Sequence, residues 1–259
     1  MSGIIVELEN ISFTYVSENT QILKTLSLKL RKGEISTILG PNGIGKTTLL
    51  LIILGWITVK SGSVRLKGRN LEEYSRKEMG QLIGFVPQYE HISFEYSLLE
   101  YVLLGRSPHL NSLESPGKKD YQIAMDALER VGLEDYAERS VLHLSGGEKQ
   151  LVLLARSLVQ ESEILLLDEP MSNLDLANKL KIIKILQTLK EEGVTILFTS
   201  HEPEIAARLS DYLILMGQNY TIEQGVVDDV LTSEKLSRIY NIPVNIEEIN
   251  GRKIVLWHE

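Results

Sequence analysis

The residues from Gly40 to Thr48 have the types and spacing that hold phosphate groups. They match the pattern G-x-x-x-x-G-K-[ST], in which Lys46 follows the last glycine and Thr47 follows the lysine. Backbone N–H groups of such a loop converge on phosphate oxygens, and a following helix adds positive potential. We expect nucleotide contacts from all nine residues: Gly40, Pro41, Asn42, Gly43, Ile44, Gly45, Lys46, Thr47 and Thr48.

The segments on either side of this loop can position it. Residues 34–39 are apolar enough for a buried strand, and residues 48–54 are apolar enough for a packed helix. A glycine turn without a ligand is the alternative interpretation, but a strand, a glycine loop and a helix in this order favour a nucleotide. Lys46 would then reach the β- and γ-phosphates, and the hydroxyl of Thr47 would join the Mg²⁺ shell.

Two carboxylates form a second candidate group. Asp168 and Glu169 directly follow the apolar run 164–167, which predicts acids at the carboxyl end of a buried strand, where open parallel sheets bind ligands. Asp168 would hold Mg²⁺ through water, and Glu169 would polarise the water that attacks the γ-phosphate. An acidic helix cap after a core strand is the alternative, and the phosphate loop upstream favours the catalytic interpretation.

Composition narrows the class of protein. The chain has 259 residues, of which 43% are hydrophobic and 24% charged, so it is globular and forms one large domain or two small ones. The net charge of −8 argues against a nucleic-acid partner. Because there is no cysteine, disulfides and thiolate metal sites are excluded. With no signal peptide and no apolar run of membrane-spanning length, the chain is expected to be soluble and to reach a membrane only through a partner.

Hydrophobic periodicity predicts an α/β fold. Alternating residues in 4–13, 25–30 and 62–67 predict an antiparallel sheet, whereas the continuous apolar runs 83–86, 164–167, 194–199 and 212–216 predict a parallel sheet covered by helices. Residues 98–159 are mostly helical in pattern, with a loop at 108–119 and a helix after Gly146-Gly147. A further helix is expected over 180–190.

A third motif, Leu144-Ser145-Gly146-Gly147-Glu148, lies between the phosphate loop and the acid pair. It resembles the LSGGQ signature of ATP-binding-cassette (ABC) ATPases. An ordinary Ser-Gly-Gly helix start is the alternative, but the order of the three motifs favours the family. The resemblance covers nearly the whole chain and implies a P-loop NTPase with a parallel core sheet, an antiparallel β-subdomain and an inserted helical subdomain. It also implies ATP and Mg²⁺ as cofactors.

The resemblance assigns roles to further residues. Tyr15 would stack on adenine, Gln88 would reach Mg²⁺ and couple to a transmembrane partner, and His201 would contact the γ-phosphate. The catalytic set it implies is Lys46, Gln88, Glu169 and His201, and the metal set is Thr47, Gln88 and Asp168.

In the family the signature acts in trans. Ser145, Gly146, Gly147 and Glu148 of one subunit, with Asp175 nearby, would close over ATP on the phosphate loop of another, so a monomer holds only half of each site. Glu148 in place of the usual Gln, Lys149 in place of a frequent Arg, and Met171 in place of a common Thr are departures that remove no catalytic group.

Two segments indicate which subgroup of ABC ATPases the chain resembles. Residues 101–109 and 230–244 resemble those of importers for iron–siderophores, haem and cobalamin. The implied protein is a homodimeric ATPase at the cytoplasmic face of the cell membrane, bound to two permease subunits through residues 88–100 and served indirectly by a substrate-binding protein. An ABC ATPase for zinc, manganese, phosphate or export, or a soluble non-transport ABC ATPase, is the alternative. We expect an ATPase domain over 1–230, with its helical subdomain at about 89–160, and a small appendage at 231–259.

Overall fold

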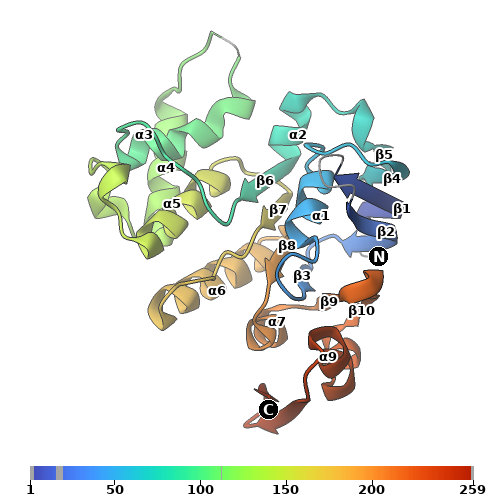
Figure 1. Cartoon of the computed structure of the whole chain (residues 1–259). Coiled ribbons are helices and arrows are strands. Elements are labelled where there is room, and N and C mark those ends of the chain that lie inside the picture. Colours follow the sequence, from blue (N-terminus) through green and yellow to red (C-terminus); the bar gives the residue numbers. More distant parts are fainter. Residues whose placement is uncertain (1–2, 16–19, 112, 258–259) are drawn as a thin grey trace. The chain divides into compact units, whose positions relative to one another are not determined.

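The computed structural model describes residues 3–15, 20–111 and 113–257 (Figure 1). The chain divides into two compact units, of which the first comprises Met1–Tyr74 and Thr195–Glu259, and the second comprises Ser75–Val194. The first unit therefore joins the blue start of the chain to its orange and red end (Figure 1).

A mainly parallel sheet forms the centre of the first unit. Strand β3 (Ile35–Leu39) lies between β8 (Thr195–Ser200) and β9 (Tyr212–Met216) and is parallel to both. Strand β10 (Ile222–Val226) pairs antiparallel with β9. All residues of β3 and β8 are buried, as expected for strands that are covered on both faces. Helix α1 (Lys46–Ile53) follows β3, and helix α7 (Pro203–Leu209) follows β8.

An antiparallel sheet in the order β2-β1-β4-β5 belongs to the same unit. Its strands are β1 (Ile4–Tyr15), β2 (Thr20–Arg31), β4 (Ser61–Leu66) and β5 (Arg69–Asn70). Val6 and Leu8 of β1 are buried and Glu7 between them is less so, as a period of two predicts, and a shift of register after Leu8 places Ile11 on the buried side as well.

The end of the chain packs into the first unit. It forms helices α8 (Val227–Val230) and α9 (Ser233–Tyr240) and a hairpin of β11 (Val244–Ile249) and β12 (Arg252–Trp257). Leu236, Ile239 and Val255 share one buried cluster with Leu39 of β3 and Ala206 of α7. The segment is therefore part of the core that supports β9, helix α7 and the end of β3.

The second unit is mostly helical. It contains α2 (Arg76–Leu82), α3 (Leu98–Leu103), α4 (Lys118–Val131), α5 (Gly146–Leu158) and α6 (Leu176–Glu191), with the parallel pair β6 (Ile83–Val86) and β7 (Ile164–Leu167). Serines at the starts of α2, α3 and α5 each form a capping box with a glutamate three residues later. The helix boundaries thus follow from local sequence signals.

The predicted fold class is confirmed, with local differences. Helix α5 includes Gly146 and Gly147 in its first turn, because Ser145 provides the cap. Helix α6 begins at Leu176 rather than at residue 180, because Asp175 caps it. Strand β10 was not expected, since its sequence gives no apolar run. The hairpin β11–β12 lies in the appendage at 231–259, for which the sequence analysis predicts no strands. The expected domain boundaries remain predictions.

Candidate functional site

The phosphate loop connects β3 to α1 in the first unit. Gly45 caps α1 at φ 106°, and Gly43 has φ 78°, both in the left-handed region that favours glycine. The first turn of α1 contains no acidic residue. Its N-terminal N–H groups and dipole are therefore suited to an anion.

Lys46 is held at the base of this loop. Its side chain is buried, and Nζ donates hydrogen bonds to the carbonyl oxygens of Gly40 (2.9 Å) and Pro41 (3.1 Å). These bonds hold the ammonium group against the loop. The sequence predicts that this loop surrounds phosphate. Lys46 thus stabilises the loop from within and places a positive charge inside it.

Neighbouring atoms crowd two glycines of the loop, backbone at Gly40 and a side chain at Gly45. A Cβ on Gly40 would lie 2.3 Å from the carbonyl oxygen of Met216, at the end of β9. A Cβ on Gly45 would lie 2.6 Å from Cγ2 of Ile22, on β2. The loop is therefore supported at its start by the parallel sheet and at its end by the antiparallel sheet.

Tyr15 and His201 belong to the same unit. The hydroxyl of Tyr15, at the end of β1, lies 3.3 Å from Oγ1 of Thr48 in α1. Phe13 packs edge-on against the Tyr15 ring, with 4.8 Å between ring centroids. His201 is exposed directly after β8, and its carbonyl oxygen accepts a hydrogen bond of 3.5 Å from the hydroxyl of Tyr240. The structure thus places Tyr15 beside the start of the phosphate-loop helix.

The carboxylates and Gln88 meet in the second unit. Asp168 (4% exposed) and Glu169 (9% exposed) follow β7, as the sequence predicts. Nε2 of Gln88 donates a 3.0 Å hydrogen bond to Oε2 of Glu169, although 81 residues separate them. Glu169 has φ 45°, a left-handed conformation that is uncommon outside glycine. Its backbone geometry is thus unusual at the position predicted to be catalytic.

Sequence reasoning missed a charged network beside Gln88. Glu90 binds Arg156 of α5 through both carboxylate oxygens, at 2.6 and 2.5 Å, and accepts a 2.7 Å hydrogen bond from the hydroxyl of Tyr101. The Arg156 guanidinium lies 4.8 Å from the centre of the Tyr101 ring. Burial acts to raise the pKa of Glu90, but the bonds from Arg156 and Tyr101 outweigh it and leave that pKa lowered. These bonds join the segment after Gln88 to helix α5, which begins at the signature glycines.

Ser145 and Glu148 of the signature bond to each other. Oγ of Ser145 accepts from the backbone N–H of Glu148, and Oε2 of Glu148 accepts from the N–H of Ser145 at 2.7 Å. These bonds lower the pKa of Glu148, and Arg139 lowers it further. Glutamate at this position therefore completes a capping box, a role that the usual Gln can also fill, so the departure keeps the helix start intact. Ser145 and Gly146 remain exposed.

Asn178 joins the signature to Asp175. A Cβ on Gly147 would lie 2.5 Å from Nδ2 of Asn178, whereas one on Gly146 would meet nothing within 4 Å. Asn178 donates to both carboxylate oxygens of Asp175, from its backbone N–H (2.8 Å) and from Nδ2 (3.0 Å). The sequence signal for Asn178 was its place three residues after a capping aspartate.

Residues 101–109 pack against neighbouring segments of the second unit. A Cβ on Gly105 would lie 2.1 Å from the carbonyl oxygen of Arg156. The buried Arg106 pairs with Asp120 (2.8 Å) and Glu161 (2.7 Å). His109 bonds through Nε2 to the carbonyl oxygen of Gln160 at 2.8 Å. These side chains secure α4 and the end of α5, so the segment has a structural role in this unit.

The predicted site residues divide between the two units. Tyr15, the phosphate loop and His201 belong to the first, whereas Gln88, the signature, the acid pair and Asp175 belong to the second. Within the second unit the structure brings Gln88 to Glu169 and the signature to Asp175. Within the first it brings Tyr15 to Thr48.

The donor atoms of the metal set suit Mg²⁺. A hydroxyl (Thr47), an amide oxygen (Gln88) and a carboxylate (Asp168) are the hard oxygen ligands that this ion prefers. Gln88 uses its NH₂ group for Glu169, so Oε1 is the atom that would face a cation. Among the described residues no cluster of three His, Cys, Asp or Glu could hold a metal by itself.

A strand, a glycine loop and a helix with a buried lysine, together with a buried Asp–Glu pair after a core strand, define a P-loop nucleoside triphosphatase. The chain belongs to the ABC transporter family, whose sequence profile, described as "ABC transporter", matches residues 23–172. It is the ATP-binding, ATP-hydrolysing subunit of an ABC importer.

Similar proteins span almost the whole chain. The molybdate import ATP-binding protein MolC of Haemophilus influenzae is 39% identical over 255 residues, covering 98% of this chain and 94% of that protein. The iron(3+)-hydroxamate import ATP-binding protein FhuC of Bacillus subtilis is 36% identical over 226 residues, covering 87% and 84%. A solved chain from a metal-chelate type ABC transporter in an inward-facing conformation is 34% identical, with a TM-score of 0.86, covering 99% and 97%.

Residues 3–15, 20–111 and 113–257 contain no helix with the length and apolar composition needed to cross a membrane.

Proposed function

We propose that this chain energises the uptake of a metal chelate of the iron–siderophore, haem or cobalamin type. The observation that carries the proposal is the likeness, over 99% of this chain, to a metal-chelate type ABC transporter. The similarity to an iron–hydroxamate import subunit supports the same substrate class.

ATP would bind at the phosphate loop of the first unit with Mg²⁺. The loop amides and Lys46 neutralise the β- and γ-phosphates, Tyr15 stacks on adenine, and Thr47, Gln88 and Asp168 supply oxygen ligands to the ion. A bound Mg²⁺ would neutralise charge on the β- and γ-phosphate oxygens. Glu169 and His201 would complete the catalytic set, which also contains Lys46 and Gln88.

Glu169 orients the attacking water and accepts its proton, while His201 contacts the γ-phosphate. The hydrogen bond from Gln88 fixes the carboxylate of Glu169 and ties it to the segment 88–100. Proton acceptance by a positioned carboxylate accounts for a substantial part of such a rate enhancement. The pair therefore supplies a route by which permease contact can alter hydrolysis.

Two copies of the chain would complete two ATP sites. Ser145, Gly146, Gly147 and Glu148 of one copy close over the nucleotide on the other, with Asp175 near the boundary. The exposure of Ser145 and Gly146 supports this role, because both stand at a helix N-terminus suited to phosphate. The dimer would be symmetric, with the same surface used by both copies.

The segment 88–100 would dock two permease subunits at the cytoplasmic face of the membrane, where ATP is present. Tyr89 and Phe94 are 80% and 68% exposed in this segment. Exposed aromatic side chains of this kind are typical of protein interfaces. A substrate-binding protein would deliver the chelate to the permeases.

Molybdate import is the second candidate, because the molybdate subunit MolC is similar over 98% of this chain. The residues 101–109 that resemble the chelate group serve a packing role, so they do not separate the two substrates.

The test is ATP hydrolysis by the complete transporter in liposomes. The chain is co-purified with its permease, and binding protein loaded with a ferric siderophore, haem, cobalamin or molybdate is added. Stimulation by one of the chelates and not by molybdate is expected. If only molybdate stimulated ATP hydrolysis, the proposed substrate would be wrong and molybdate would take its place. A complex carrying Glu169→Gln gives the background rate of hydrolysis.

A further inference from the structure

A short turn between β9 and β10 lies beside the phosphate loop in the first unit. Residues 218–220 form one turn of 3₁₀ helix in which Asn219 (φ 54°) and Tyr220 (φ 62°) both adopt left-handed backbone conformations. Such conformations cost free energy for residues other than glycine. The turn is closed by hydrogen bonds between Gly217 and Thr221 and between Gln218 and Thr221.

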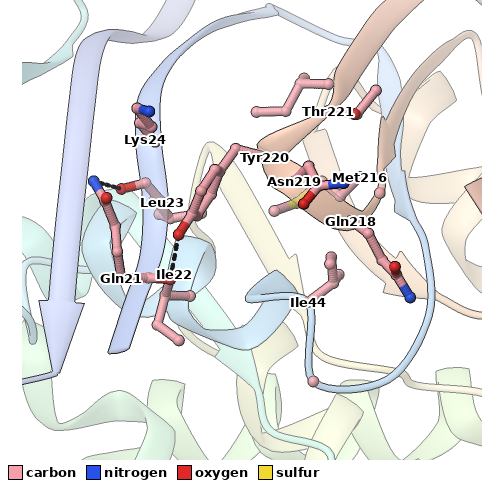
Figure 2. A pocket seen from close by; sticks show the side chains of 13 residues that line it. Gln21, Ile22, Leu23, Lys24, Ile44, Met216, Gln218, Asn219, Tyr220 and Thr221 are labelled. Atoms are coloured by element: carbon pink, nitrogen blue, oxygen red, sulfur yellow. Dashed lines mark hydrogen bonds between the residues drawn. The ribbon is translucent and has the colours of Figure 1, made fainter. Parts of the chain in front are cut away.

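Tyr220 connects this turn to β2. Its hydroxyl donates a 3.2 Å hydrogen bond to the carbonyl oxygen of Gln21, 199 residues away in the sequence (Figure 2). Nζ of Lys24 lies 5.8 Å from the centre of the Tyr220 ring. The side chain thus holds the segment of β2 that begins at Gln21.

That segment of β2 supports the end of the phosphate loop. Ile22 follows Gln21 directly, and its Cγ2 occupies the space that a Cβ on Gly45 would need. Gly45 in turn caps α1, whose first residue is Lys46. A displacement of β2 at Gln21 would therefore be transmitted to Gly45 and Lys46.

The end of β9, which leads into the turn, abuts the start of the loop. The carbonyl oxygen of Met216, the last residue of β9, is the atom that excludes a side chain from Gly40. Between these supports lies a cavity of about 290 Å³ lined by Gln21–Lys24, Gly43, Ile44 and Met216–Ile222 (Figure 2). The two ends of the loop are thus supported, whereas its apex at Gly43 and Ile44 borders open space.

We propose that Tyr220 is a positioning residue for ATP binding, which holds β2 at Gln21 and Ile22 so that Gly45 and Lys46 keep the geometry that accepts phosphate. The proposal rests on nucleotide binding at the phosphate loop. Because such coupling is reciprocal, bound ATP must also stabilise the turn at residues 218–222.

A matched pair of variants tests the proposal. Tyr220→Phe removes the hydroxyl and keeps the ring. Gln224→Leu removes a bond that reaches the same strand β2 from β10, the 2.9 Å bond from Nε2 to the carbonyl oxygen of Ser27. Tyr220→Phe is expected to weaken ATP binding by about threefold to tenfold, the loss that one hydrogen bond supports. Gln224→Leu is expected to change ATP affinity by less than about twofold, with thermal stability recorded for both.

Steady-state kinetics and hydrogen exchange separate positioning from mere stabilisation. In the reconstituted transporter, Tyr220→Phe should raise KM for ATP with little change in kcat. In the wild-type chain, ATP should slow amide exchange at residues 218–222. Equal effects of both variants on ATP affinity, unchanged affinity in Tyr220→Phe, or no protection of the turn in the wild type would each overturn the proposal. A wild-type chain that binds no ATP would overturn the nucleotide site itself.

Discussion

The side-chain amide of Gln88 donates a hydrogen bond to the carboxylate of Glu169, with 3.0 Å between Nε2 and Oε2. Gln88 begins the segment proposed to meet the permease, and Glu169 is the proposed catalytic base. The bond thus links the two functions through one contact. A carboxylate held by a donor is also restricted in orientation, which suits a residue that must position water.

Glu169→Gln should abolish most ATP turnover and preserve ATP binding. The amide keeps the size of the side chain but cannot accept the proton of the attacking water, so kcat should fall by about 10²-fold or more. Phosphate release gives the rate, and a fluorescent ATP analogue gives the affinity. Turnover close to that of the wild type would remove Glu169 from its assigned role.

Lys46→Ala should weaken nucleotide binding itself. The substitution removes a charged donor to phosphate and also the bonds to Gly40 and Pro41 that shape the loop. A loss of about 1.5–3 kcal/mol, or roughly tenfold to a hundredfold in Kd for ATP, is expected for a charged hydrogen-bond donor. The exposed Lys60→Ala is the control, and equal ATP affinity in both variants would contradict the phosphate role of Lys46.

The two signature glycines should respond differently to alanine. Gly147→Ala places Cβ 2.5 Å from Nδ2 of Asn178, so it should lower the unfolding temperature and disturb Asp175. Gly146→Ala meets nothing within 4 Å in the chain, so it should leave the unfolding temperature unchanged and reduce ATPase activity only when two copies associate. Thermal unfolding and ATPase assays over a range of protein concentration distinguish the two. The same loss of stability in both variants would refute the outward role of Gly146.

The Glu90–Arg156 pair should make stability depend on pH. The pKa of Glu90 is lowered in the folded chain from its usual 4.5, so the contribution is present above that value and is lost as pH falls through the folded pKa. Glu90→Gln should therefore destabilise the chain near neutral pH, by about 1 kcal/mol because the pair is partly exposed, and have little effect in acid. Denaturant unfolding of Glu90→Gln and of the exposed control Glu95→Gln, at several pH values, measures this. A destabilisation by Glu90→Gln that stays constant with pH would count against the ion pair.

The sequence predicts the parts of the fold that are buried on both faces. Strands β7, β8 and β9 follow largely continuous apolar runs, and β3 is apolar enough to be predicted as buried. The glycine loop directly follows β3, and the acid pair directly follows β7. Strand β10 is not predicted from the sequence, because its residues are partly buried or exposed and therefore give no apolar pattern. The sequence of β11 is interrupted by charges, and the single short apolar run 254–257 of β12 does not show that the two segments pair as a hairpin.

The candidate site shows a similar division. Motif spacing predicts residues whose chemistry is local to a loop or a strand end, such as Lys46 and Glu169. The contacts of Asn178 with Gly147 and of Arg156 with Glu90 could not be predicted in this way, because the partners are far apart in the sequence. Such contacts are decided by how helices pack, which a local pattern does not record.

We propose that each ATP site is shared by two copies of the chain. Light scattering of the Glu169→Gln chain during size-exclusion chromatography tests it most directly. With Mg²⁺ and ATP the mass should double from the 29.2 kDa of one chain, and with Mg²⁺ alone it should stay at that value. A chain that binds ATP and remains at 29.2 kDa under both conditions would contradict the account.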